Sequence, residues 1–134
     1  MCMKKLFVLL LSIAVFTACS GLPADLPESC IPTGETMANF PEKLMFPDVV
    51  IVSSAPVTAE EVAGTLGKEG VRATFCVKAG LDEVKTWFDK QFPGATFYEH
   101  EGSYGWYTGT EMVSVGLEEI FDKYMKFSVR QQVF

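Results

Sequence analysis

The sequence predicts an α+β domain in which an antiparallel sheet carries one main helix and one short helix, both packed on one face. Two observations favour this class. Apolar and polar residues alternate in several short segments, which is typical of strands that have one solvated face. Four of the six expected strands follow the last helix, and this clustering favours an antiparallel sheet over an alternating parallel fold.

A buried strand and a short helix are expected at the start of the domain. Residues 49–52 form a continuous β-branched run between prolines, which predicts a buried strand. Thr58 followed by Glu61 has the spacing of a capping box and predicts a short helix over residues 59–66. A glycine and a threonine weaken this helix, so a strand hairpin that turns at residues 67–70 is the alternative.

The next strand and helix follow from two clear periodicities. Every second side chain of residues 71–78 is apolar, which predicts a strand with Cys76 on its polar face. Leucine, valine and aromatic residues recur on one side of residues 81–92, which predicts the main helix. Asp82 and Glu83 suit the positive end of that helix, and a Pro-Gly pair ends it.

Four strands are expected after the main helix. The first two occupy residues 95–101 and 104–109, with a turn at residues 102–103 between them. The third strand occupies residues 112–117 and the fourth runs from residue 125 to the C-terminus. Both alternate between apolar and polar side chains, so we expect each to have one buried face.

The first eighteen residues have the layout of a secretory signal. Lys4 and Lys5 precede an apolar run over residues 6–16, and small residues precede Cys19. This run is too short to span a bilayer, which needs about 20 residues. An uncleaved anchor or a buried helix is the alternative. The Thr-Ala-Cys ending resembles the lipobox of bacterial lipoprotein precursors.

In the lipoprotein family, the cysteine after the cut is acylated on its sulfur and on its new amino group. The resemblance implies a cut between Ala18 and Cys19 and a membrane attachment through acyl chains on Cys19. Two or more chains give stable anchoring. Ser20 stands where an aspartate would retain the protein in the inner membrane, so the resemblance implies the outer membrane, facing the periplasm. Phe16 departs from the usual leucine of the family.

The rest of the chain resembles small α+β domains of envelope lipoproteins of unassigned function, in which an aromatic-rich helix precedes a run of strands. No functional residue carries over from that resemblance. The expected organisation is a signal peptide over residues 1–18, a lipidated cysteine and Pro-rich tether over residues 19–45, and a single α+β domain over residues 46–134. Prolines make regular structure in the tether unfavourable, so we expect the domain to stand off the membrane.

The charge balance excludes some partners. The chain has 11 Lys and Arg and 17 Asp and Glu; loss of Lys4 and Lys5 with the signal would leave 9 against 17, a net charge of −8. Nucleic acid is therefore not an expected partner, because its phosphates require Lys and Arg. Electrostatic docking to anionic headgroups is also disfavoured.

The cysteines predict one disulfide. Cys2 lies in the leader and Cys19 would carry lipid, which leaves Cys30 and Cys76. An even pair in an oxidising compartment predicts a disulfide between them. Two unpaired thiols are the alternative.

His100, the only histidine, lies between Glu99 and Glu101 and could act as a general base or a metal ligand. On a strand, however, the two glutamates point away from the face of His100. No second histidine or free cysteine with ligand spacing accompanies it. A solvated histidine is therefore favoured, and no metal, cofactor or catalytic residue is predicted.

Aromatic residues crowd one expected hairpin. Tyr98, His100, Tyr104 and Trp106 would share one face of a regular pleat, with Tyr107 beside them. Rings with polar tips suit the recognition of a protein or a glycan. The alternative is that half of them complete a small core.

The leading hypothesis is a lipid-anchored, non-enzymatic binding or assembly module of the bacterial envelope. Its sheet face and aromatic hairpin would contact another envelope protein or cell-wall glycan, because an anchor raises the local concentration near such partners. The first alternative is an inhibitor or immunity-type lipoprotein whose acidic surface covers a basic active site. The second is a weak enzyme or metal site around His100.

Overall fold

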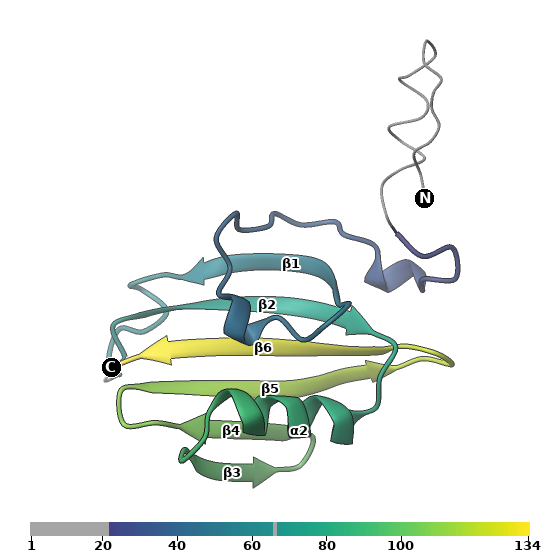
Figure 1. Cartoon of the computed structure of the whole chain (residues 1–134). Helices are drawn as coiled ribbons and strands as arrows, with labels where there is room; N and C mark the ends of the chain where they lie inside the picture. The colour runs from purple at the N-terminus through teal and green to yellow at the C-terminus, as the bar shows by residue number, and fades with distance from the viewer. Residues whose placement is uncertain (1–21, 66) are drawn as a thin grey trace.

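The computed structural model describes residues 22–65 and 67–134, which form one antiparallel sheet with an α-helix on one face (Figure 1). The six strands lie in the order β1-β2-β6-β5-β4-β3. The strands are β1 (Val50–Val57), β2 (Glu69–Val77), β3 (Thr96–His100), β4 (Ser103–Tyr107), β5 (Glu111–Ile120) and β6 (Met125–Val133). The helices are α2 (Leu81–Gln91) and the 3-10 turns η2 (Glu28–Cys30) and η3 (Glu42–Leu44).

This architecture confirms the antiparallel sheet and its main helix, but one α-helix rather than two packs on the sheet among the described residues. Because β6 pairs with both β2 and β5, the last strand joins the β1–β2 hairpin to the β3–β4–β5 meander. The pairing of β2 with β6 runs without a bulge from Glu69 opposite Val133 to Val77 opposite Met125. The sheet therefore has two edges, β1 and β3.

The predicted short helix over residues 59–66 is wrong. Its capping box does form, since the Thr58 amide donates to Glu61 Oε1 (2.8 Å) and the Glu61 amide donates to Thr58 Oγ1 (3.2 Å). The chain then makes isolated turns, and Gly64 takes a left-handed φ of 83°. Helix nucleation is costly, and a glycine in this conformation ends the segment before the helix can propagate. Leu66 lies outside the described residues.

The main core lies between the sheet and α2. Val84 and Phe88 of the helix are fully buried against Phe75, Trp106 and Phe127 of the sheet. The rings of Phe88 and Trp106 stack with centroids 5.4 Å apart, and those of Phe75 and Phe127 meet at 5.5 Å. Each such side chain contributes about 1.5–3 kcal/mol when it leaves water. The apolar side chains that mark the helical period of α2 and the alternation of the strands therefore pack together in one core.

The indole of Trp106 is also held by a polar contact from the helix. Its Nε1–H donates to Asp89 Oδ1 (2.8 Å), and Lys85 Nζ lies 3.0 Å from Asp89 Oδ2. Burial by itself raises the pKa of Asp89, but the Trp106 hydrogen bond and the Lys85 pair outweigh it and lower that pKa. The folded state therefore favours the ionised Asp89.

Residues 22–48 differ from the expected tether, because side chains at both ends of this segment pack on the domain while much of the chain between them is exposed. Leu44 of η3 is fully buried in the main core, and Phe40, Met45 and Phe46 pack against it. In Figure 1, η3 lies over β2 and β6 on the face that also carries α2. The second cover of the core is therefore this proline-flanked turn rather than a second α-helix.

The same segment passes around the edge strand β1. The Ser54 amide donates to the carbonyl of Glu35 (2.9 Å), and the Met37 amide donates to Ser54 Oγ (2.7 Å). Upstream of this crossing, Cys30 is buried on the opposite face of the sheet with Val52. Prolines disfavour longer helices and strands here but do not prevent packing.

The structure contains a disulfide between Cys30 and Cys76, whose Cα atoms are 5.9 Å apart. Cys76 lies on the face opposite Phe75, as the alternation predicts, but it is fully buried rather than solvated. The reason is that η2 and Tyr124 cover it. Cys2, Cys19 and the expected signal peptide lie outside the described residues. No helix among residues 22–65 and 67–134 is long and apolar enough to cross a membrane.

The buried disulfide yields a stability prediction. Replacing Cys30 and Cys76 together by serine should lower the free energy of unfolding by on the order of 4 kcal/mol, because the bond closes a loop of about 46 residues in the unfolded chain. Urea unfolding of the purified domain measures this difference. Equal midpoints for the two proteins would contradict it.

The ionised Asp89 yields a pH prediction. Because folding lowers its pKa, the stabilisation that Asp89 provides is present above about pH 4 and is lost as the pH falls through the lower folded value. Asp89→Asn keeps an acceptor for the Trp106 indole but cannot ionise. The melting temperature of the wild type should therefore exceed that of this variant near neutral pH, and the difference should shrink as the pH is lowered. A difference in melting temperature that stays constant with pH would contradict the assignment.

Candidate functional site

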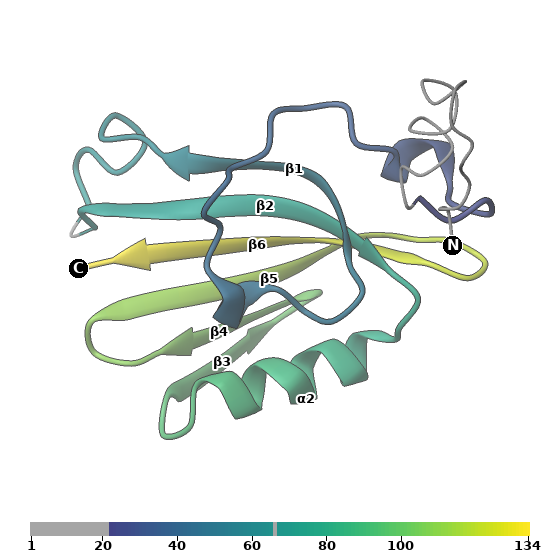
Figure 2. The ribbon, with the colours of Figure 1, turned by 45° about the horizontal axis from the view of Figure 1, so that its top comes forward.

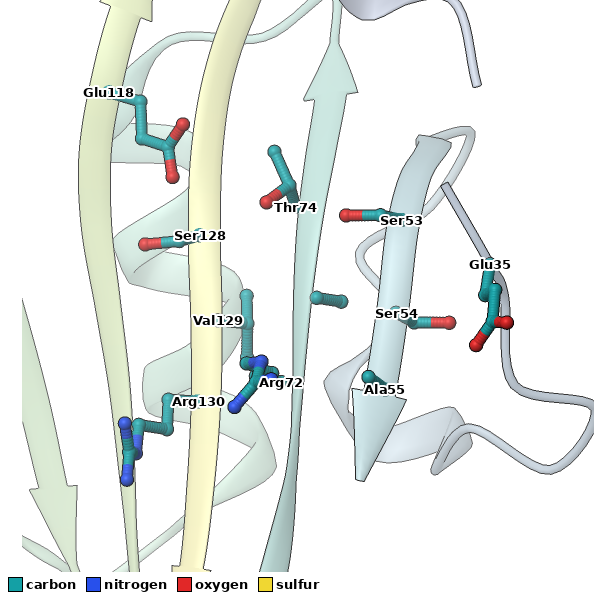
Figure 3. Close-up of a pocket in the computed structure, with 11 residues that line it drawn as sticks. Glu35, Ser53, Ser54, Ala55, Arg72, Thr74, Glu118, Ser128, Val129 and Arg130 are labelled. Carbon is teal, nitrogen blue, oxygen red and sulfur yellow. The ribbon is translucent and has the colours of Figure 1, made fainter. Parts of the chain in front are cut away.

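The two faces of the sheet differ sharply in cover. One face is buried under α2 and η3. The other face carries no α-helix among the described residues and is covered only near the end of β2, by η2 and Tyr124; we call it the open face (Figure 2). In the close-up of Figure 3, α2 lies behind these strands and the labelled polar side chains lie in front of them. The open face is therefore the extended surface on which a partner could lie without unfolding the domain.

The centre of the open face is hollowed. A depression of about 540 Å³ lies over β1, β2, β6 and β5 (Figure 3). Its polar lining residues are Glu35, Ser53, Ser54, Arg72, Thr74, Glu118, Ser128 and Arg130. Small hydroxyls and charges thus dominate this surface, in contrast to the apolar face under α2.

Strand register builds the floor of the hollow. Ser53 pairs with Thr74, Thr74 with Ser128, and Ser128 with Gly116, so small side chains form a row across four strands. A Cβ atom at Gly116 would lie 3.3 Å from Ser128 Oγ, so the floor is tight even without a side chain at this position. Short side chains keep the floor low and offer hydroxyl groups for hydrogen bonds.

Two arginines lie side by side in the next row of this face, two residues along β2 and β6 from Thr74 and Ser128. Arg72 of β2 and Arg130 of β6 are directly opposite each other, a position that places Cβ atoms about 5 Å apart. Like charges so placed repel. Arg72 forms an ion pair with Glu61, whereas no carboxylate within residues 22–65 and 67–134 pairs with Arg130. The pair thus offers a guanidinium that suits a carboxylate from a partner.

The predicted single face of Tyr98, His100, Tyr104 and Trp106 is wrong. The two-residue turn pairs His100 with Ser103, so Tyr98 lies opposite Gly105, not opposite Tyr104 or Trp106. Even-numbered residues of β3 therefore share a face with odd-numbered residues of β4. Tyr98 and His100 lie on the open face, while the other two lie on the face of α2.

Trp106 and Tyr104 serve the core rather than a recognition surface. Trp106 is 1% exposed beneath α2, and Tyr104 stacks on Phe97 with centroids 5.8 Å apart. Lys85 Nζ of α2 lies 4.5 Å from the centroid of the Phe97 ring. The alternative that half of the aromatic residues complete the core therefore describes this side of the hairpin.

The other half of the cluster forms a small patch on the open face. This aromatic patch consists of Tyr98, Tyr107, Met112 and Phe134, which line a shallow hollow of about 260 Å³. Tyr107 pairs with Met112 in register, and its ring lies 6.0 Å from that of Phe134. A Cβ at Gly105 would lie only 2.8 Å from Met112 Cε, so Gly105 makes room for that side chain. Met112 and Phe134 were not singled out from the sequence, because they come from other strands.

His100 lies at the end of β3, where its side chain is exposed and Ser103 Oγ donates to its carbonyl (3.2 Å). Glu99 pairs in register with Tyr104 and so faces the α2 side, away from His100, as the alternation predicts. Glu101 lies in the turn rather than on the strand. Within the described part of the chain, no group of three or more His, Cys, Asp or Glu is arranged to hold a metal ion.

Comparisons with family models, with curated proteins and with solved structures found no match for this chain. Its function must therefore be inferred from its own residues and their arrangement. The open face offers two features for that purpose, the arginine pair with its hydroxyl floor and the aromatic patch.

The division of the aromatic cluster predicts that two substitutions destabilise the domain to very different extents. Trp106→Ala should lower the free energy of unfolding by about 3–5 kcal/mol, because it leaves a cavity under α2 and removes the bond to Asp89. Tyr98→Ala, at a side chain that is 52% exposed, should change it by less than about 0.5 kcal/mol. Urea unfolding compares them, and equal losses would show that the hairpin register is different.

Proposed function

We propose that this chain is a lipid-anchored, non-enzymatic binding module of the bacterial envelope that holds another envelope protein on its open face. The observation that carries the proposal is the arginine pair, Arg72 and Arg130, beside a floor of small hydroxyls. Cross-strand like charges cost stability in the isolated domain. A partner that supplies a carboxylate there would relieve this repulsion.

The chemistry of the open face suits an acidic segment of a protein. Arginine, tyrosine and methionine are enriched in protein interfaces, and the open face presents Arg130, Tyr98, Tyr107 and Met112. A broad, shallow surface of this kind can accept an extended chain. Arginine can bind a carboxylate through two parallel hydrogen bonds, which gives specificity as well as attraction.

The expected anchor complements this role. Acyl chains on Cys19 would hold the domain at a membrane, and the lipobox resemblance points to the periplasmic side of the outer membrane. Tethering raises the effective concentration of a binding site near partners in the same membrane. A modest intrinsic affinity would then suffice for stable association in the cell.

Charge reversal on the open face tests the proposal. Cells that express wild type, Arg130→Glu or Lys90→Glu are crosslinked intact, and proteins attached to the chain are identified by mass spectrometry. Arg130→Glu should reduce recovery of the partner by roughly tenfold or more, because it removes a charge-assisted hydrogen bond and adds repulsion. Lys90→Glu is the matched control, since this exposed residue lies on α2.

The outcomes test two separate points, whether the partner is a protein and whether it binds on the open face. One envelope protein recovered with wild type and Lys90→Glu, but not with Arg130→Glu, would support the proposal. Equal recovery with all three proteins would contradict the open face as the binding surface. Recovery of cell-wall glycan in place of a protein would contradict the protein partner.

A further inference from the structure

The N-terminal segment is tied to one end of the sheet by a polar cluster. Asp25 accepts a hydrogen bond from the Tyr124 hydroxyl through Oδ1 (2.9 Å), and its Oδ2 lies 3.2 Å from Lys78 Nζ. The Tyr124 bond and the Lys78 pair lower the pKa of Asp25, and the Asp25 carboxylate in turn raises the pKa of Lys78. Both groups therefore stay charged over a wide pH range around neutrality, which maintains the tie.

Apolar contacts and the disulfide reinforce this tie. Leu26 packs against the buried cluster of Val52, Cys76 and Tyr124. Cys30 then joins β2 covalently through Cys76. The chain is thus held at several points from residue 25 onward, all near the end of β2 and the β5–β6 turn.

The position of Cys19 follows from chain length alone. Only Ser20 and Gly21 lie between Cys19 and Leu22, which makes three steps from Cα to Cα, and each step spans at most about 3.6 Å. The Cα atom of Cys19 therefore lies within about 11 Å of that of Leu22. An acyl anchor on Cys19 would emerge at this end of the domain, not at the end of a long tether.

Three exposed apolar side chains belong to elements at the same end. Ile120, the last residue of β5, is 69% exposed, and Ile31, which follows η2, is 41% exposed. Leu22 is 40% exposed. In Figures 1 and 2, η2, the β5–β6 turn and the start of the described chain share one end of the domain, and the C-terminus lies at the other.

We infer that this end is a membrane-contact surface, in which Ile120 and Ile31 insert into the interfacial layer of the bilayer that holds the acyl chains of Cys19. The inference rests on the proposed lipidation of Cys19. The occupant is a lipid surface because the anchor leaves the domain no more than a few residues of slack. Apolar side chains held this close to a bilayer lose contact with water when they enter it.

Charge does not drive this contact. Glu118, Glu119 and Asp122 lie near Lys123 and Lys126 around the β5–β6 turn, so acidic residues slightly outnumber basic ones there. Attraction to anionic lipid needs a basic cluster, which this arrangement does not provide. The contact should therefore be insensitive to salt and to the anionic lipid content of the membrane.

The contact would orient the binding surface proposed above. With this end on the membrane, the strands point away from the bilayer and the open face is roughly perpendicular to the membrane plane. The ten residues of β5 extend about 34 Å, so the aromatic patch near the start of β5 would lie far from the lipid. An extended partner could then meet the open face side by side on the same membrane.

Fluorescent labels test the orientation. Lys123→Cys and Thr110→Cys place a single reactive thiol in the β5–β6 turn or in the β4–β5 turn at the opposite end of β5. The lipidated chains are labelled with an environment-sensitive dye and reconstituted in phosphatidylcholine vesicles, with and without added phosphatidylglycerol. The label at residue 123 should shift to the blue and be quenched by shallow nitroxide lipids. The label at residue 110 should remain water-like.

A second substitution tests the apolar contact itself. Ile120→Asp in the Lys123→Cys background should abolish the blue shift, and its high exposure means that the fold should be unaffected. Thr110→Asp in the same background is the matched control and should leave the shift intact. A water-like label at residue 123 in the otherwise unchanged chain would overturn the inference, as would a shift that survives Ile120→Asp.

The test also separates this inference from the proposed anchoring. Intact mass shows whether the chain carries acyl groups, and Cys19→Ala should release it from the vesicles. An unacylated chain in the host envelope would overturn the anchor and the orientation together. An acylated chain whose two labels behave alike would overturn the orientation alone.

Discussion

The pairing of β2 with β6 is the constraint on which most of this structure depends. It places Phe75 opposite Phe127 in the core and Arg72 opposite Arg130 on the open face. Side chains alternate between faces with a period of two, so a slip of one residue would exchange these two sets. The arginines would then enter the core, and burying an unpaired charge costs far more than the pairing gains. The core therefore specifies the register, and the register places the arginines of the proposed binding surface as a consequence.

The two faces of the sheet differ in composition, since one is the apolar core face and the other is the polar face of the proposed binding surface. The face under α2 is closed by stacked aromatic rings, including the indole of Trp106 that is held by Asp89. The open face can carry repelling arginines and exposed tyrosines because the other face supplies the apolar burial. Such features reduce the stability of the isolated domain. Their position on one solvated surface is what makes them informative about function.

The N-terminal segment links the domain to its expected anchor. Over residues 22–48 it forms no α-helix or strand, yet it wraps around β1 from the buried Cys30 on one face to the buried Leu44 on the other. Packing of this kind does not require regular structure, because side chains and the disulfide supply the contacts. An anchor at Cys19 would consequently be joined to a rigid attachment rather than to a long spacer.

The sequence by itself determined the local features of this protein. Alternation over residues 71–78 and the helical period over residues 81–92 predicted β2 and α2, and cysteine arithmetic predicted the pair that the structure joins. These signals are local or compositional, so one chain suffices to see them. Tertiary structure alone decided that the capping box at Thr58 starts no helix, that Cys76 is covered, and that side chains around η2 and η3 pack on the sheet. It also decided which aromatic residues face outward. The hairpin register assigned Tyr98 and Trp106 to opposite faces, and contacts between distant segments decided which side chains are buried.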